Sequence, residues 1–292
     1  MTQSAPFRSL VPQSSFPFSQ SQRLYFLHMT RKSVCLLALI WLSCISLVAQ
    51  DARNRLATAH AQYYTPTASG LKSFHCDASI DWKAMLTRFS GTEVPDDNPT
   101  LTFLQTVHLA TTDDLRGNGE LEWTSTVEPP AERKSSMQQM KDGLQTTISG
   151  FFQTWNAYMN GSMVPFPDST VTVTNSGEGV HLRGTSKETT LDEDFDKNML
   201  LTKVQVANPS LTVLATPTFT STEDGLLLSS VTSQIHQPTT APETEATIRI
   251  EYAKVDSFQI PSHIVIDIKN TGVIEFRLNA CKVSVADWAK KN

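Results

Sequence analysis

The chain has 292 residues, of which 24 are basic and 29 acidic, giving a formal net charge of −5 at pH 7. This acidic balance excludes proteins that bind nucleic acid or anionic lipid headgroups through a basic surface. Only one apolar run, near the amino terminus, approaches the length of a membrane span, and it is too short to cross a bilayer.

That apolar run covers residues 34–48, follows Arg31 and Lys32, and ends before Ala49 and Gln50. A positive segment, a short apolar core and a small residue at the cleavage position are the three parts of a secretory signal peptide. We therefore predict a signal peptide over residues 29–49. The mature chain, residues 50–292, would be exported to the periplasm or the extracellular space.

The residues before Met29 are rich in Ser, Gln, Pro and Phe, whereas export peptides normally begin at the amino terminus. We therefore expect Met29 to be the true start and residues 1–28 to be a non-native or disordered extension. One alternative is that these residues belong to the signal peptide and form a genuine, long, positively charged first segment. Another is acylation at Cys44, although Trp41 stands where a lipobox has Leu. Cleavage before Gln50 would leave 20 basic against 29 acidic residues.

The predicted mature chain keeps two cysteines, Cys76 and Cys281. An even pair in an oxidising compartment predicts a disulfide. A bridge over so long a loop stabilises by about 5 kcal/mol in the chain-entropy model. The alternative is two buried free thiols in the first and last strands. No metal site is predicted. His75 and its neighbour Cys76 cannot form one alone, and no other His or Cys lies nearby at a ligand spacing.

The mature chain is expected to begin with a helix and a strand. Ala and Arg favour the helix over residues 51–64. Residues 71–79 place Phe74, Cys76 and Ala78 on one alternating face, which predicts a half-buried strand.

Two short helices and a hairpin are expected next. The first helix ends at Gly91, and its apolar residues recur at helical spacing: Trp82, Met85, Leu86 and Phe89. The second helix enters through Pro99, and its expected apolar face is Leu101, Leu104 and Val107. A turn at residues 117–119 and a strand at 120–126 complete this section.

The strongest periodic signal predicts one long amphipathic helix over residues 131–160. Its apolar residues follow one another by three or four positions, with Gln, Lys, Asp and Thr between them. They are Met137, Met140, Leu144, Ile148, Phe151, Trp155 and Tyr158. Gly161 and Pro165 end the pattern.

From residue 170 to residue 285, alternating runs of Val, Thr, Ile and Leu are separated by Gly, Pro, Asn and Asp. This is typical of an antiparallel meander. The expected strands cover residues 171–173, 180–182, 201–206, 211–220, 226–236, 246–255, 263–269 and 274–283, with a polar loop at 238–242. We therefore predict a single α+β domain over residues 50–292, in which a curved antiparallel sheet packs on helices.

An acidic alternation interrupts this pattern at Asp192, Asp194, Asp196 and Asn198. Such spacing occurs in Ca²⁺-binding loops, but an EF-hand needs Gly at its sixth position and Glu at its twelfth. Those positions hold Lys197 and Lys203. A solvated strand end or turn is expected instead, with a weak cation site as the alternative.

No catalytic signature survives inspection, so we predict a protein that is not an enzyme and needs no cofactor. Ser162 lacks the Gly-x-Ser-x-Gly frame of a nucleophile elbow. The histidines have no companions at a metal-ligand spacing, and neither a phosphate-binding Gly loop nor a dinucleotide fingerprint is present. A hydrolase would require Ser, His and carboxylate groups to meet from distant segments.

The order of these elements resembles that of the LolA/LppX-like periplasmic carriers of lipoproteins and lipids. The runs that carry the likeness are residues 217–219, 223–226, 248–252 and 258–261, and a last strand through Phe276 and Cys281. In that family an incomplete antiparallel barrel wraps around helices, and acyl chains bind in the apolar space between them.

The resemblance implies that the partners are lipid or lipoprotein acyl chains, with peripheral contacts to envelope components. The implied ligand wall is Leu144, Ile148, Phe151, Phe152, Trp155 and Tyr158. An aromatic stripe on a helix is ordinarily core, so an envelope structural or protein-interaction module with a filled interior is the alternative. The stripe contains no Arg, and no lipoprotein-gating residue is assigned.

Overall fold

The computed structural model describes residues 54–117, 119–160, 171–237, 240–287 and 289. All of them belong to the compact unit Ala52–Asn292. The predicted signal peptide and the extension before it lie outside the described residues, as does Ser162. Within the described ranges, no helix combines the length and the apolar character that crossing a membrane requires.

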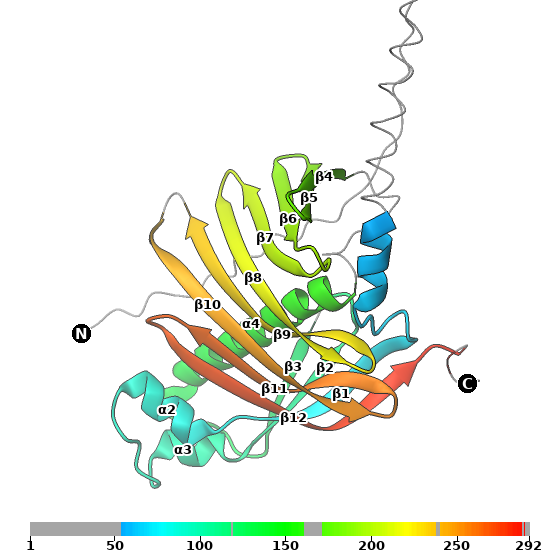
Figure 1. Cartoon of the computed structure of the whole chain (residues 1–292). Helices are drawn as coiled ribbons and strands as arrows, with labels where there is room; N and C mark the ends of the chain where they lie inside the picture. Colours follow the sequence, from blue (N-terminus) through cyan, green and yellow to red (C-terminus); the bar gives the residue numbers. More distant parts are fainter. Residues whose placement is uncertain (1–53, 118, 161–170, 238–239, 288, 290–292) are drawn as a thin grey trace, which may run out of the picture. The chain divides into compact units, whose positions relative to one another are not determined.

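The described chain is α+β and is built on one antiparallel sheet of twelve strands. Figure 1 shows how these strands are arranged. The strands are β1 (Leu71–Ser79), β2 (Val107–Asp113), β3 (Glu120–Ser125), β4 (Thr172–Ser176), β5 (Gly179–Ser186), β6 (Thr189–Phe195), β7 (Leu201–Asn208), β8 (Leu211–Thr222), β9 (Gly225–Gln237), β10 (Thr240–Val255), β11 (Phe258–Ile268) and β12 (Gly272–Val285). The sheet is open, with β3 and β4 as its edges. The predicted antiparallel meander is therefore confirmed.

The strand order joins the two ends of the described chain. Strands β4 to β12 lie side by side in chain order, and β1 then pairs with β12. Cys76 of β1 and Cys281 of β12 form a disulfide across this pair, spanning a sequence separation of 205. The predicted bridge is confirmed, and the alternative of two free thiols is excluded.

Four helical segments and one 3-10 turn accompany the sheet in the described chain. Residues 54–62 are helical, and the others are α2 (Trp82–Ser90), α3 (Pro99–Leu104), η1 (Ala131–Arg133) and α4 (Lys134–Met159). The long helix α4 runs along one face of the sheet (Figure 1). Its apolar stripe is buried there, as the periodicity predicted, apart from Met140, which is partly buried.

A side chain of α4 also binds the edge strand β3. Gln145 Oε1 accepts a hydrogen bond from the backbone N–H of Leu121 at 2.7 Å, and its amide donates to the carbonyl of Gly119 at 3.2 Å. The amide therefore satisfies backbone groups that an edge strand would otherwise leave to solvent. This contact anchors the middle of the helix to the sheet.

The segment that follows the first helix, Tyr63 and Tyr64, is hydrogen-bonded to strands β7 and β9. Tyr64 N–H donates to the carbonyl of Leu226 at 3.1 Å. A side chain at Gly225 would lie 2.9 Å from the carbonyl oxygen of Gln62, and the backbone there has φ +119°. Glycine is therefore required for this close approach. The hydroxyl of Tyr63 accepts a hydrogen bond from Leu201 N–H at 2.8 Å, which ties the segment to β7.

Three details differ from the sequence-based expectations. Strand β10 begins at Thr240, inside the polar loop expected at residues 238–242, of which residues 238 and 239 lie outside the described ranges. Val107 begins strand β2 instead of continuing the helical face, because α3 ends at Leu104. Strand β6 was not among the expected strands, because its acidic residues favoured a solvated strand end or turn. It pairs with both β5 and β7, so neighbouring strands outweigh its weak intrinsic preference.

Candidate functional site

A cavity of about 260 Å³ lies between α4 and strands β7, β8 and β9. We call it the α4 cavity. The sheet supplies mainly branched or small apolar side chains, which are Val204, Val206, Val213, Ala215 and Val231, together with Ser233. The helix supplies Gln153, Thr154, Ala157 and Tyr158. One wall is therefore apolar, and the other carries polar groups.

Strand pairing explains why the sheet wall is apolar. Val204 of β7 lies opposite Ala215 of β8, which lies opposite Ser233 of β9. Cross-strand partners point to the same face of a sheet, and side chains alternate between the two faces along a strand. Each of the three strands therefore contributes every second residue to this wall. The alternation that predicted these strands thus also produces the cavity lining.

Of the six residues expected to form a ligand wall, Tyr158 lines the α4 cavity. The others, Leu144, Ile148, Phe151, Phe152 and Trp155, are buried within the main apolar core. Phe74 of β1 packs edge-on against both Phe152 and Trp155, with ring centroids 5.6 and 5.9 Å away. These five side chains therefore pack as core, and direct ligand contact by them stays a prediction.

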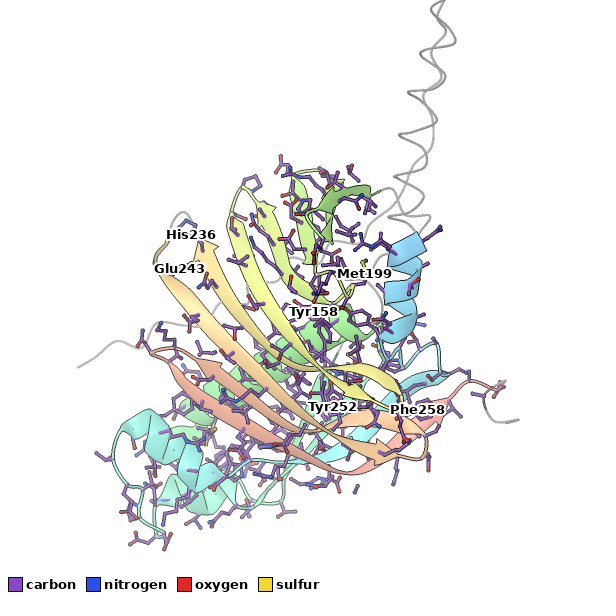
Figure 2. The ribbon with its side chains drawn as sticks, in the orientation of Figure 1. Tyr158, Met199, His236, Glu243, Tyr252 and Phe258 are labelled. Atoms are coloured by element: carbon purple, nitrogen blue, oxygen red, sulfur yellow. A yellow bond between two sulfur atoms is a disulfide. The ribbon has the colours of Figure 1, made fainter. Side chains whose placement is uncertain are left out.

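Tyr158 belongs to that core and also lines the cavity. Figure 2 labels its side chain. It is 5 % exposed, and its ring packs edge-on against Phe219 at 6.4 Å. Its hydroxyl makes no hydrogen bond with a described residue. Burial is the main cause of a raised pKa at this phenol, and the nearby Glu193 carboxyl adds to it. The hydroxyl therefore stays protonated and can donate a hydrogen bond.

Glu193 is the most unusual polar residue beside the cavity. It lies on β6 opposite Val204, a cavity-lining residue, and is only 1 % exposed. Its Oε1 atom is buried without a hydrogen-bond partner among the described residues. Burial raises its pKa to about 8, because the charged form is poorly solvated there. The carboxyl is therefore mainly neutral at pH 7.

Asp113 is a second buried carboxyl, and it differs from Glu193 in having partners. The side-chain amide of Asn156 donates to both of its oxygens, at 3.1 and 3.0 Å, and Leu115 N–H donates to Oδ1 at 3.2 Å. Burial raises the Asp113 pKa to about 6, opposed by these hydrogen bonds. Asp113 is thus a structural link between the end of β2 and α4.

The acidic alternation on β6 forms a hydrogen bond to His181, an ion pair with Arg183 and a turn. His181 Nδ1 lies 2.7 Å from Asp194, and Arg183 Nε lies 3.3 Å from Asp192. The Asp196 carboxylate accepts hydrogen bonds from the backbone N–H groups of Asn198 and Leu200, so it shapes the following turn. In the part of the chain that the structure describes, no group of three or more His, Cys, Asp or Glu residues could hold a metal ion.

The chain matches no protein-family model, no curated protein and no solved structure. Its function must therefore be inferred from the α4 cavity and the groups beside it.

Of the ten residues that line the α4 cavity, the sequence predicted Tyr158 as a site residue and missed the other nine, which include Gln153, Thr154 and Ala157 of the helix. It also missed Glu193. A signal for Glu193 was present, because Leu191, Glu193 and Phe195 alternate with Asp192 and Asp194. That period of two places the glutamate on the apolar face. Gln153 and Ala157 lie outside the apolar stripe of α4, so no pattern marked them as cavity residues.

Proposed function

We propose that this protein is an exported, non-enzymatic carrier or binder of a lipid or lipidated protein, and that the α4 cavity holds an acyl chain. The observation that supports this most is the apolar sheet wall facing α4. Small-molecule sites are mostly apolar concavities with a few polar groups. The lining of the α4 cavity has that composition.

The dimensions of the cavity favour the end of one acyl chain. Its volume is about 260 Å³, slightly below the roughly 300–1,000 Å³ usual for ligand sites. With about 30 Å³ for each water-sized group, it holds roughly nine such groups. Each buried CH₂ contributes about 0.8 kcal/mol, so even a short segment of chain gains appreciable affinity.

The resemblance to LolA/LppX-like carriers is consistent with this proposal. An open antiparallel sheet with a long helix on one face is the arrangement expected of an incomplete barrel around helices. Export through the predicted signal peptide and the Cys76–Cys281 bridge fit a protein that works in an oxidising compartment.

A filled structural or protein-interaction module is the second candidate. The dense packing of Phe74, Phe152 and Trp155 favours it, since this part of the interior holds side chains instead of open space. The two candidates differ in what they predict for the α4 cavity. The carrier needs that cavity to accept a ligand, whereas the module does not.

Native mass spectrometry of the exported protein, purified from its own host and followed by organic extraction, tests the proposal. Co-purifying lipid or acylated peptide is the expected result. A clean mass equal to the chain of residues 50–292 less two hydrogens would confirm signal cleavage and the disulfide, but it would favour the interaction module.

A matched pair of variants locates the ligand. Val213→Phe places a larger side chain in the cavity wall, and Val265→Phe makes the same change on the opposite face of the sheet, at a half-buried position of β11. We expect Val213→Phe to weaken binding of the neutral dye Nile red about ten-fold, the equivalent of about two excluded CH₂ groups. Val265→Phe should bind like the wild type. Equal binding by both variants would place the ligand elsewhere.

A further inference from the structure

The polar groups at the α4 cavity indicate which end of a lipid it accepts. Of its ten lining residues, none is Lys, Arg or His. A ligand carboxylate or phosphate in this cavity would therefore be buried without a positive partner, which is strongly unfavourable. Glu193 beside Val204 supplies no positive charge to such an anion either.

An unused hydrogen-bond donor stands in the same lining. The hydroxyl of Tyr158 is bound to no described residue, although the side chain is 5 % exposed. The other helical hydroxyl, on Thr154, donates to the Gly150 carbonyl at 2.9 Å and is already satisfied. A buried donor is stabilised by an acceptor, and an uncharged carbonyl supplies one without adding charge.

The remaining lining groups agree with a neutral ligand. Gln153 and Ser233 carry side chains that both donate and accept hydrogen bonds. Neither needs a charged partner. The neutral form of Glu193 at pH 7 likewise leaves no fixed charge to attract an ammonium group.

On the basis of the proposed function, we propose that the α4 cavity selects an acyl chain whose carbonyl is uncharged, as in an ester or amide, and that Tyr158 donates a hydrogen bond to that carbonyl. Esterified lipids and the acyl groups of lipidated proteins have this chemistry. Free fatty acids at neutral pH do not, because their carboxyl group is ionised.

Competition against bound Nile red at neutral pH tests this selectivity with four probes of equal chain length: decane, methyl decanoate, decanoate and decylamine. We expect methyl decanoate to bind most tightly and decanoate to bind at least about ten-fold more weakly. Tyr158→Phe should weaken methyl decanoate about three- to ten-fold and leave decane unchanged. Val265→Phe serves as the folded control.

The outcomes separate this inference from the proposed function. If no probe binds, decane included, the carrier proposal itself is wrong. If decane binds but methyl decanoate and decanoate bind equally, the cavity takes acyl chains without reading the carbonyl. Tighter binding of decylamine would mean that Glu193 attracts a cation, and an unchanged methyl decanoate affinity in Tyr158→Phe would remove Tyr158 as the donor. Each of these last three results overturns the inference.

Discussion

The indole Nε1 of Trp155 donates a hydrogen bond to the hydroxyl of Tyr252 at 3.0 Å, and that hydroxyl donates in turn to the carbonyl of Leu228 at 2.8 Å. The chain of bonds joins α4 to β10 and β9 through the interior. It lets a fully buried Trp side chain satisfy its only polar atom.

Removing the Tyr252 hydroxyl should therefore destabilise the protein. Tyr252→Phe leaves the buried indole N–H of Trp155 without its partner and removes a hydrogen bond to the Leu228 carbonyl, so we expect a loss of about 1–3 kcal/mol in the free energy of unfolding. Urea denaturation followed by circular dichroism measures it. Tyr158→Phe is the matched control, because its hydroxyl has no hydrogen-bond partner among the described residues, and it should change stability by less than about 0.5 kcal/mol. Equal losses of stability in the two variants would contradict the hydrogen bonds assigned to the Tyr252 hydroxyl.

The Cys76–Cys281 bridge should contribute strongly to stability. It joins residues separated by 205 positions, and the chain-entropy model assigns about 5 kcal/mol to so long a loop. The double variant Cys76→Ala with Cys281→Ala should unfold at a much lower urea concentration than the oxidised protein. Reduction by dithiothreitol should bring the wild type close to the variant. A midpoint that neither change lowers would show that the bridge is absent in solution.

Glu193 should make stability fall as the pH rises. Burial raises its pKa from 4.5 to about 8, so between these values the unfolded chain has lost a proton that the folded chain retains. The contribution of Glu193 to the free energy of unfolding is therefore fully present below pH 4.5, and it is lost as the pH rises to about 8. Glu193→Gln should remove this dependence of stability on pH. We expect it to be more stable than the wild type by about 2–4 kcal/mol at high pH, with little difference in acid.

Asp113→Asn provides the contrast for that experiment, because Asp113 accepts hydrogen bonds from Asn156 and Leu115. An amide there places one donor against another, and we expect a loss of about 1–3 kcal/mol at pH 7. Unfolding curves recorded across the pH range separate the two carboxyls. Parallel curves for the wild type and Glu193→Gln would show that Glu193 does not titrate in a buried site.

Trp155→Ala should separate core packing from ligand binding. Trp155 is fully buried and does not line the α4 cavity. We expect a stability loss of about 3–5 kcal/mol, with Nile red affinity in the remaining folded protein close to that of the wild type. Thermal unfolding and dye titration measure the two effects. Affinity that falls more than stability would mean that the aromatic stripe itself contacts the ligand.

The sequence alone determined most of the elements, because their signals are local. Helical spacing over residues 131–160 predicted α4, and period-two runs predicted most strands of the meander. The limits of α2 follow from the Asp81 and Gly91 caps, which act on the adjacent turn. The disulfide was also predictable, because only two of the cysteines lie in the predicted mature chain.

Only the tertiary structure decided how these elements create a cavity. Pairing of β6 with β5 and β7 turned an acidic run into a strand and buried Glu193 at its centre. Pairing across β7, β8 and β9 brought residues from Val204 to Ser233 onto one wall. The facing side of α4 combines Tyr158 of the apolar stripe with Gln153, Thr154 and Ala157, which the stripe does not include. Strand register and helix placement depend on contacts between distant segments, which no local periodicity encodes.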